Sequence, residues 1–237
     1  MLRYIDDICK SHNISYWLSS GTLLGAVRHG GFIPWDDDLD IEMLRPDYER
    51  LIEILKKQQS SKYIIQTYDT DTKYVIPFAK LRDLHSCVVE EHVPKYRYNG
   101  CWVDIFPLEK NTLLCLKFTV CLYYLFLAPY GIIKNRPIIL SRVYKFIIYN
   151  FIFRSIYQIN RILPLKKYYH ACGVEFYKDR NLKDIFPLQR IEFEGQMFPA
   201  PRNYKNYLNK IYGNYLKMPS IDKIETHNLK IVFSSSM

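Results

Sequence analysis

The sequence predicts a β-sheet with helices packed on one face, in a fold of the α/β or α+β class. Segments with helical and strand periodicity alternate over the first 110 residues. Of the 237 residues, 49% are hydrophobic, which is enough to bury a sizeable core. An apolar, aromatic and basic stretch, 111–170, then interrupts the alternation. One main domain carrying an elaboration is therefore the expected organisation.

The first part of the alternating region reads as helix, strand, helix and strand. Apolar side chains recur at helical spacing near the N-terminus, a β-type run follows, and Gly30-Gly31 breaks the second helix. The next strand alternates strictly, so that Asp38, Asp40 and Glu42 share one face. The expected elements are a helix over 2–11, a strand over 14–19, a helix over 23–28 and a strand over 38–43.

Pro46 is expected to start the following helix, because its missing N–H costs nothing in a first turn. That helix carries an apolar stripe that includes Leu51 and Leu55. Pro107 is expected to close the last strand of this region. The further elements are strands over 62–68, 74–82, 86–90 and 101–106, a hairpin over 191–198, a helix over 203–217 and a disordered tail at 234–236.

The net charge of +9 comes from one segment. Between Asn111 and His170 there are nine Lys and Arg residues and no Asp or Glu, so the remaining 24 bases balance the 24 acids. This distribution argues against a protein that coats nucleic acid and favours one specialised surface.

Three interpretations of residues 111–170 stay open. Residues 113–133 approach the length of a membrane span, although Lys117 lies inside them and Pro129 to Gly131 interrupt their end. Helices that pack on the core or lie in a membrane interface are the second interpretation. The third is an ordinary helical subdomain with a solvated basic face.

The cysteine pattern indicates a reducing compartment. None of the six Cys residues has C-x-x-C spacing and most lie in apolar runs, so buried free thiols are expected. The N-terminus lacks the apolar region of a signal peptide.

The run Asp36 to Asp40 is the strongest candidate for chemistry. The carboxylates of Asp38 and Asp40 share a strand face and are close enough to hold one hard cation, and Mg²⁺ prefers such a pair together with phosphate oxygens. Asp36 and Asp37 lie nearer the loop. The alternative is an acidic surface run at the entry of a strand.

Ser20, Gly21 and Thr22 form a turn between a strand and a helix just before these acids. Backbone N–H groups at a helix N-terminus hold phosphate, and glycine permits close approach. A phosphate-binding turn followed by an acid pair on the next strand is more specific than either feature alone.

Other polar residues lie in the neighbouring segments. Asp104, inside an apolar strand, either is a structural hydrogen-bonded residue or completes a metal site and accepts a proton from an attacking hydroxyl. Lys80 and Arg82 share a strand face and could contact phosphate, or form an exposed face. Arg28 and His29 end the short helix beside the acid loop and are candidates for the leaving group's phosphate.

Together these residues resemble the LicD family, which is itself similar to the fukutin-related transferases. The resemblance runs from about residue 3 to residue 228, is weakest across 111–170, and departs at Ser20, where many relatives have Gly. No Cys-rich zinc insertion is present in the sequence. The matching stretches are Ser20 to His29, Gly31 to Asp40, Lys80 to Asp83, Val103 to Pro107, Phe193 to Gly195, Tyr204, Leu208, Tyr212-Gly213, Leu216 to Pro219 and His227.

The resemblance implies an α+β, nucleotidyltransferase-like mixed sheet with a helical basic-aromatic insertion and a C-terminal helix. It implies transfer of a substituted phosphate, typically phosphocholine, from a CDP-activated donor to a hydroxyl of a cell-surface glycan, with release of CMP. Asp38, Asp40 and Asp104 would hold Mg²⁺, with Mn²⁺ as an alternative, and the Gly21-Thr22 turn would hold donor phosphate. The expected parts are a catalytic core over 1–110, the insertion over 111–170 and a completing part over 171–237.

A lipid-linked acceptor would give the insertion a purpose, which is to hold a cytoplasmic enzyme at the inner face of the cell membrane. The first alternative keeps the fold but transfers NMP to a small molecule or sugar. The second is a non-enzymatic module that binds RNA or lipid. Nucleic acid is not expected as a partner, because the acids would repel its phosphates unless a metal intervened. The sequence does not identify the donor alcohol or the acceptor hydroxyl.

Overall fold

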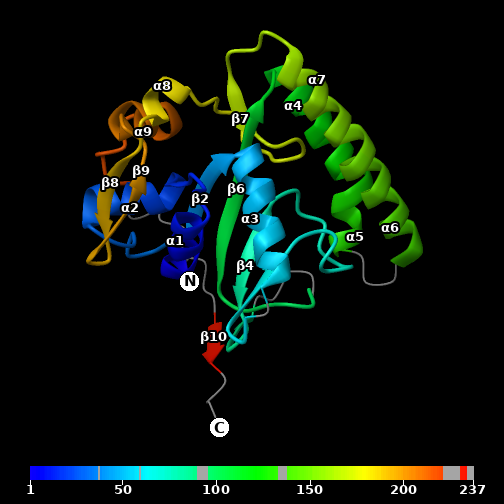
Figure 1. The fold of residues 1–237 in the computed structure, drawn as a ribbon, viewed down its shortest axis with the longest axis horizontal. Coiled ribbons are helices and arrows are strands. Elements are labelled where there is room, and N and C mark those ends of the chain that lie inside the picture. Colours follow the sequence, from blue (N-terminus) through cyan, green and yellow to red (C-terminus); the bar gives the residue numbers. More distant parts are fainter. Residues whose placement is uncertain (37, 59, 90–95, 133–137, 221–229, 234–237) are drawn as a thin grey trace.

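The computed structural model describes residues 1–36, 38–58, 60–89, 96–132, 138–220 and 230–233. Its centre is a mixed sheet in the order β1 (Trp17–Leu18), β2 (Asp40–Leu44), β6 (Trp102–Lys110), β4 (Ala79–Asp83) and β3 (Tyr63–Gln66) (Figure 1). β2 and β6 run parallel, whereas the other pairs in this order are antiparallel. A short strand, β7 (Tyr168–His170), pairs with the end of β6. This mixed sheet with its surrounding helices confirms the α+β prediction.

Pairing register gives the sheet two different faces. Ile41, Ile105 and Ala79 lie across from one another on β2, β6 and β4, and all three are fully buried in the core. α1 (Leu2–Ser11) and α3 (Arg45–Lys57) contribute to this core, and α3 lies across the sheet (Figure 1). Since side chains alternate along a strand, the opposite face carries the polar residues of the same strands.

The C-terminal part packs against the beginning of the chain. The hairpin of β8 (Gln189–Phe193) and β9 (Gln196–Ala200) contacts α2 (Ser20–His29) and β1. α8 (Leu182–Ile185) and α9 (Tyr204–Tyr212) complete this side, as Figure 1 shows. The hairpin turn uses positive φ angles, 52° at Glu194 and 70° at Gly195, which match the twist of two-residue β-turns.

Residues 113–132 and 138–162 form two helical arms, which we call the helical hairpin. The first arm joins α4 (Leu113–Leu122), a π-helical turn (Tyr123–Leu127) and α5 (Ala128–Ile132). The second joins α6 (Ile138–Lys145), a π-helical segment (Phe146–Phe153) and α7 (Arg154–Ile162). The arms lie side by side at one flank of the sheet (Figure 1). The prediction that this segment is helical is confirmed.

Several predicted boundaries were wrong. β6 continues through Pro107, whose carbonyl accepts the N–H of Ala171. The ring nitrogen of Pro107, which has no hydrogen to donate, faces the edge of β6 that pairs with β4. That pairing ends at Ile105, so no hydrogen bond to β4 is lost at Pro107. α2 starts at Ser20 and not at Leu23, whereas β2 starts at Asp40 and not at Asp38. The observed β1, β3 and β4 are shorter than the predicted strands.

β7, α8 and β10 (Lys230–Phe233) were not predicted, and β10 pairs with β5 (Ser86–Val89) in a separate ribbon. The predicted helices at the N-terminus and after Pro46, the hairpin near residue 191 and the C-terminal helix are all confirmed as elements. The tail 234–236, together with Asp37 and His227, lies outside the described residues.

Candidate active site

Three aspartates meet on the polar face of the sheet. Asp40 on β2 lies directly across from Asp104 on β6, and Asp38 reaches them from the loop before β2. One carboxylate oxygen of each lies within 4.8 Å of the other two. The three residues predicted as metal ligands from the sequence therefore lie together in the fold. Asp38, however, approaches from a loop and not from the expected strand.

Burial makes this cluster electrostatically costly. Asp40 is 9% exposed and Asp104 is 5% exposed. Burial raises the pKa of Asp40, and the neighbouring charges of Asp38 and Asp104 raise it further. Burial also raises the pKa of Asp104, although the Lys80 ammonium opposes that shift. Three carboxylates with one adjacent lysine fit a divalent cation, which would offset the remaining repulsion.

Lys80 is part of the cluster. It lies across from Asp104 on β4, its Nζ is 2.7 Å from Oδ1 of Asp104, and it is 4.5 Å from the centre of the Trp102 ring. Arg82, two residues further on, is buried and donates to Gln66 at 2.8 Å and to the Gly100 carbonyl at 2.9 Å. Of the two residues predicted to contact phosphate, Lys80 therefore lies at the acid cluster, and Arg82 belongs to a neighbouring polar network.

The predicted phosphate turn is the first turn of α2. The N–H of Asp40 donates to Oγ1 of Thr22 at 2.7 Å, and the N–H of Ser19 donates to the carbonyl of Asp40 at 3.1 Å, so this turn is fixed to β2. Gly21 leaves room for Asp36, since a Cβ there would lie 2.4 Å from Oδ2 of Asp36. Ser20 has a φ of 44°, in the left-handed region that favours glycine.

Arg28 and His29 lie at the other end of α2. Arg28 is half-buried and donates to the Tyr215 carbonyl at 3.4 Å, and burial lowers the pKa of its guanidinium. His29 is exposed, with its ring 6.4 Å from that of Trp35. For Tyr212 of α9, burial raises the pKa of the hydroxyl, and the charges of Asp40 and Asp36 raise it further.

Glu42 forms a buried network that the sequence did not reveal. It lies on β2 and is fully buried, and Nη2 of Arg180 approaches its Oε1 to 2.6 Å. The ring of His170 hydrogen-bonds to Glu42 at 2.7 Å, while Trp17 and Tyr207 donate to it at 3.1 and 2.7 Å. These partners come from β1, β7, the segment before α8, and α9.

Charge balance keeps Glu42 ionised. Burial raises the pKa of Glu42, but the Arg180 charge and the His170 hydrogen bond outweigh burial and hold that pKa below its usual range. Burial lowers the pKa of His170, whose ring stacks between Phe106 and Phe176. One sequence feature could have identified Glu42: it is an acid between apolar residues of a predicted strand, the same feature that identified Asp104.

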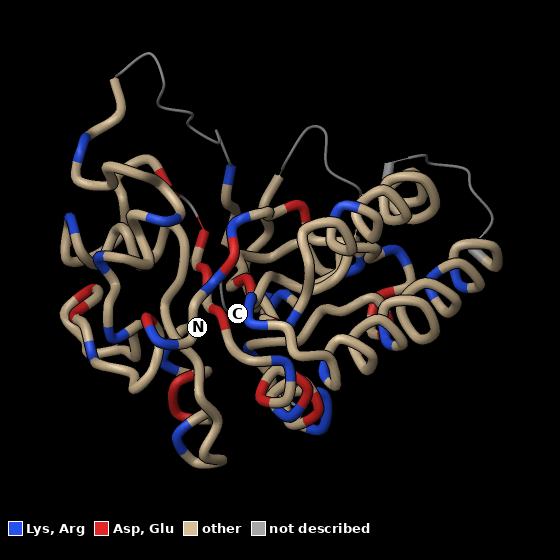
Figure 2. Tube along the Cα trace, turned by 90° about the horizontal axis from the view of Figure 1, so that it is seen from above, with Lys and Arg blue, Asp and Glu red and all other residues tan. Residues whose placement is uncertain are grey.

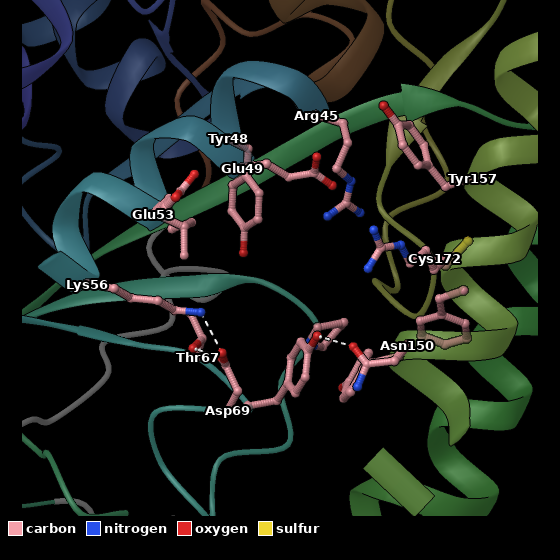
Figure 3. A pocket seen from close by; sticks show the side chains of 16 residues that line it. Arg45, Tyr48, Glu49, Glu53, Lys56, Thr67, Asp69, Asn150, Tyr157 and Cys172 are labelled. Carbon is pink, nitrogen blue, oxygen red and sulfur yellow. Dashed lines mark hydrogen bonds and ion pairs between the residues drawn. The ribbon is translucent and has the colours of Figure 1, made fainter. Parts of the chain in front are cut away.

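A separate cavity of about 350 Å³ lies between α3, the segment after β3 and the second arm of the helical hairpin (Figure 3). None of the three clustered aspartates lines it. Arg45 at its wall pairs with Glu109 at 2.9 Å, and Lys56 pairs with Asp69 at 2.5 Å. Glu49 and Arg154 also line this cavity, but among the described residues the aspartate cluster is where three carboxylates meet, so it is the better candidate for the chemistry.

Comparison with known proteins identifies the family. Residues 13–124 match the model of the LicD/FKTN/FKRP nucleotidyltransferase domain, a range that contains the three aspartates and Lys80. Lipopolysaccharide cholinephosphotransferase LicD of Haemophilus influenzae is 27% identical over 251 residues, covering 97% of this chain and 92% of that protein. The chain therefore contains a domain of the LicD/FKTN/FKRP family.

Two further relatives share shorter stretches with this chain. Human ribitol 5-phosphate transferase FKRP is 44% identical over 45 residues, which cover 19% of this chain and 9% of FKRP. The uncharacterized protein RP689 of Rickettsia prowazekii is 43% identical over 65 residues, or 27% of this chain and 24% of that protein. The names of LicD and FKRP describe transfer of two different substituted phosphates, phosphocholine and ribitol 5-phosphate.

Proposed function

We propose that this chain transfers a substituted phosphate, in the first instance phosphocholine, from a CDP-activated donor to a glycan hydroxyl and releases CMP. The acceptor would be a cell-surface glycan of the lipopolysaccharide, capsule or teichoic-acid type. The observation that carries the proposal is the buried cluster of Asp38, Asp40 and Asp104 beside the first turn of α2. Similarity to a cholinephosphotransferase over 97% of the chain supports the same reaction class.

Asp38, Asp40 and Asp104 would hold Mg²⁺ or Mn²⁺. When bound, such an ion neutralises the donor pyrophosphate and the charge on the leaving CMP. The first turn of α2, formed by Ser20, Gly21 and Thr22, would present backbone N–H groups to donor phosphate. We also propose substrate contacts for three basic residues, Arg28 and His29 at the end of α2 and Arg82 on β4. This proposal rests on their positions in the sequence and in these two elements.

Asp104 is proposed to take the proton of the acceptor hydroxyl. The acceptor oxygen forms a bond to the phosphorus that carries the alcohol, the bond from that phosphorus to the bridging oxygen breaks, and CMP leaves with the bond electrons. Burial raises the pKa of Asp104, while the Lys80 ammonium, whose Nζ lies 2.7 Å from Oδ1, opposes that rise and orients the carboxylate. These two opposing effects suit a group that must accept a proton and then lose it.

A donor panel tests the proposal. The protein is incubated with Mg²⁺, an acceptor glycan and either CDP-choline, CDP-ribitol or CTP, and CMP and pyrophosphate are measured separately. Release of CMP from a CDP-alcohol supports the proposal, whereas pyrophosphate from CTP alone would replace it with transfer of NMP. The donor that reacts also identifies the alcohol.

Matched variants test the site. Asp38→Asn with Asp40→Asn should lower turnover by at least about a hundredfold, because charge-stabilising groups of this kind contribute several kcal/mol. Glu53→Gln, which alters an exposed carboxylate that pairs with Lys57, is the control and should keep full activity. A stably folded double variant with undiminished turnover would refute the catalytic role of the cluster.

A further inference from the structure

The outer side of the helical hairpin is unusually apolar. More than half of the exposed large hydrophobic side chains among the described residues lie between 113 and 163. On the first arm Leu114, Phe118 and Leu125 are 80%, 55% and 63% exposed, at spacings of four and seven residues that place them on one helix face. The second arm adds Ile139 at 75% and Ile162 at 84%. A surface of this size marks an interaction site.

The inner side of the same hairpin is fixed to the catalytic core by polar contacts. Nζ of Lys145 donates to backbone carbonyls of the segment after β3, at 3.0 Å to Tyr68 and 2.7 Å to Thr72. In the first arm, the hydroxyl of Thr119 accepts the N–H of Gly173 at 3.2 Å. Asn160 of the second arm donates to Asn111 at 3.1 Å.

These contacts distinguish a hairpin that lies on a bilayer from one that crosses it. Leu113–Tyr130 is long and apolar enough to cross, with a mean hydropathy of 1.6 and 22% of it buried. However, each arm makes polar contacts with the core, and a spanning arm would have to leave those contacts and take polar groups into hydrocarbon. An amphipathic hairpin that stays docked and inserts only its outer side avoids that cost.

Charge selects the kind of bilayer. Residues 111–170 contain no Asp or Glu, and the exposed charged side chains described on the hairpin are Lys117, Arg142, Arg154 and Arg161. Figure 2 shows Lys and Arg along the helices of this flank, whereas Asp and Glu are spread over other segments of the chain. A basic rim around an apolar face is complementary to anionic headgroups.

We propose that the outer side of the helical hairpin docks in the interface of an anionic lipid bilayer. Its apolar side chains would reach the boundary with the acyl chains, and Lys117, Arg142 and Arg161 would contact lipid phosphates. The protein is then a peripheral one, held by apolar burial together with electrostatic attraction. This proposal is independent of the proposed reaction, so loss of membrane binding and loss of transfer are separate results.

Vesicle flotation tests the docking directly. The full-length protein is mixed at low salt with vesicles of phosphatidylethanolamine and about one-third phosphatidylglycerol, or with vesicles of phosphatidylcholine alone. We expect flotation with the anionic vesicles, less with the neutral ones, and release by high salt. Failure to float with the anionic vesicles at low salt would overturn the proposal. Retention through both high salt and alkaline carbonate washes would overturn it in favour of a spanning helix.

Variants locate the surface. Leu114→Glu with Phe118→Glu should weaken binding to anionic vesicles at least about tenfold, because two exposed apolar side chains that would insert into the bilayer are lost and two acids are added. The matched control, Leu84→Glu with Met197→Glu, makes the same chemical change at exposed positions outside the hairpin and should bind normally. Equal loss in both variants would overturn the assignment of this face.

Two further measurements complete the test. Arg142→Gln with Arg161→Gln should lower binding to anionic vesicles and leave the weak binding to neutral ones unchanged; unchanged binding to the anionic vesicles would contradict the electrostatic part. Light scattering of the protein without lipid tests whether the outer side of the hairpin instead binds a second copy of the chain. A stable dimer that Leu114→Glu with Phe118→Glu makes monomeric would assign the face to a second copy of the chain and overturn docking on lipid.

Discussion

Removing Arg180 should destabilise the fold through Glu42. Arg180 is 2% exposed, and its Nε and Nη2 atoms lie 3.1 and 2.6 Å from Oε1 of Glu42. In Arg180→Met, the methionine fills much of the volume of the arginine stem, but Glu42 keeps its charge in a fully buried position. The side chains of Trp17 and Tyr207 would still donate to it, yet no permanent cation would remain beside it.

Breaking a buried ion pair by removing one partner costs about 3–5 kcal/mol, because the other charge stays desolvated. We therefore expect Arg180→Met to lower the free energy of unfolding by about that amount. Adding Glu42→Gln removes the stranded charge and keeps an oxygen for Trp17 and Tyr207. The double variant should thus recover about half of the loss or more, since the two sites are in contact and their effects are not additive.

Urea unfolding followed by circular dichroism measures these free energies. Tryptophan fluorescence provides a second probe, because the Trp17 indole itself bonds to Glu42. Lys57→Met, which breaks an exposed pair with Glu53, is the control and should cost less than about 1 kcal/mol. If Arg180→Met stayed within about 1 kcal/mol of wild type, or the double variant were no more stable than Arg180→Met, the reasoning about the stranded charge would be refuted.

Three other predictions follow from single contacts. Ser20→Gly should raise the unfolding free energy by up to about 1 kcal/mol, since serine has a φ of 44° there, and a loss of stability would contradict the strain. Gly25→Ala should lower the thermal midpoint by several degrees, because its Cβ would meet the Gly31 carbonyl at 2.4 Å, and an unchanged midpoint would refute that crowding. Burial lowers the pKa of His170, so as pH falls below about 6.5 only the unfolded chain gains a proton there, and stability should fall. His170→Gln should flatten that part of the stability–pH curve, and an identical slope in the variant would contradict the assignment.

Local chemistry explains which features could be predicted from the sequence. Gly30 adopts a φ of 70° at the end of α2, and Pro46 lies in the first turn of α3, as each residue's backbone preference requires. The choice of Asp40 and Asp104 also came from local alternation in apolar strands. That the two residues are neighbours depends on the parallel pairing of β2 and β6, which only the fold establishes.

Pairing partners distant in the chain explain the failures. Pro107 was expected to end a strand, because proline has no N–H to donate. In the structure β6 pairs with β4 before Pro107 and with β7 after it, so the missing N–H falls where the pairing with β4 has already ended. Ser20 and Gly21 were expected in a turn, and they belong to the first turn of a helix whose N-cap residue, Ser19, makes no side-chain capping hydrogen bond and instead bonds to the hydroxyl of Tyr207. The partners of Glu42 lie up to 165 residues away, beyond any local pattern.

The same distant partners bear on how the acid cluster works. Asp40 is held through its own backbone by Ser19 and Thr22, and two residues later β2 is held by the Glu42 network. The match to the family domain ends at residue 124, whereas His170, Arg180 and Tyr207 all follow it. A site that works by fixed charges loses rate when a carboxylate shifts by a fraction of an ångström. The C-terminal part thus holds β2, the strand that carries Asp40, through the contacts to Glu42, and the similarity to LicD also extends over 97% of the chain.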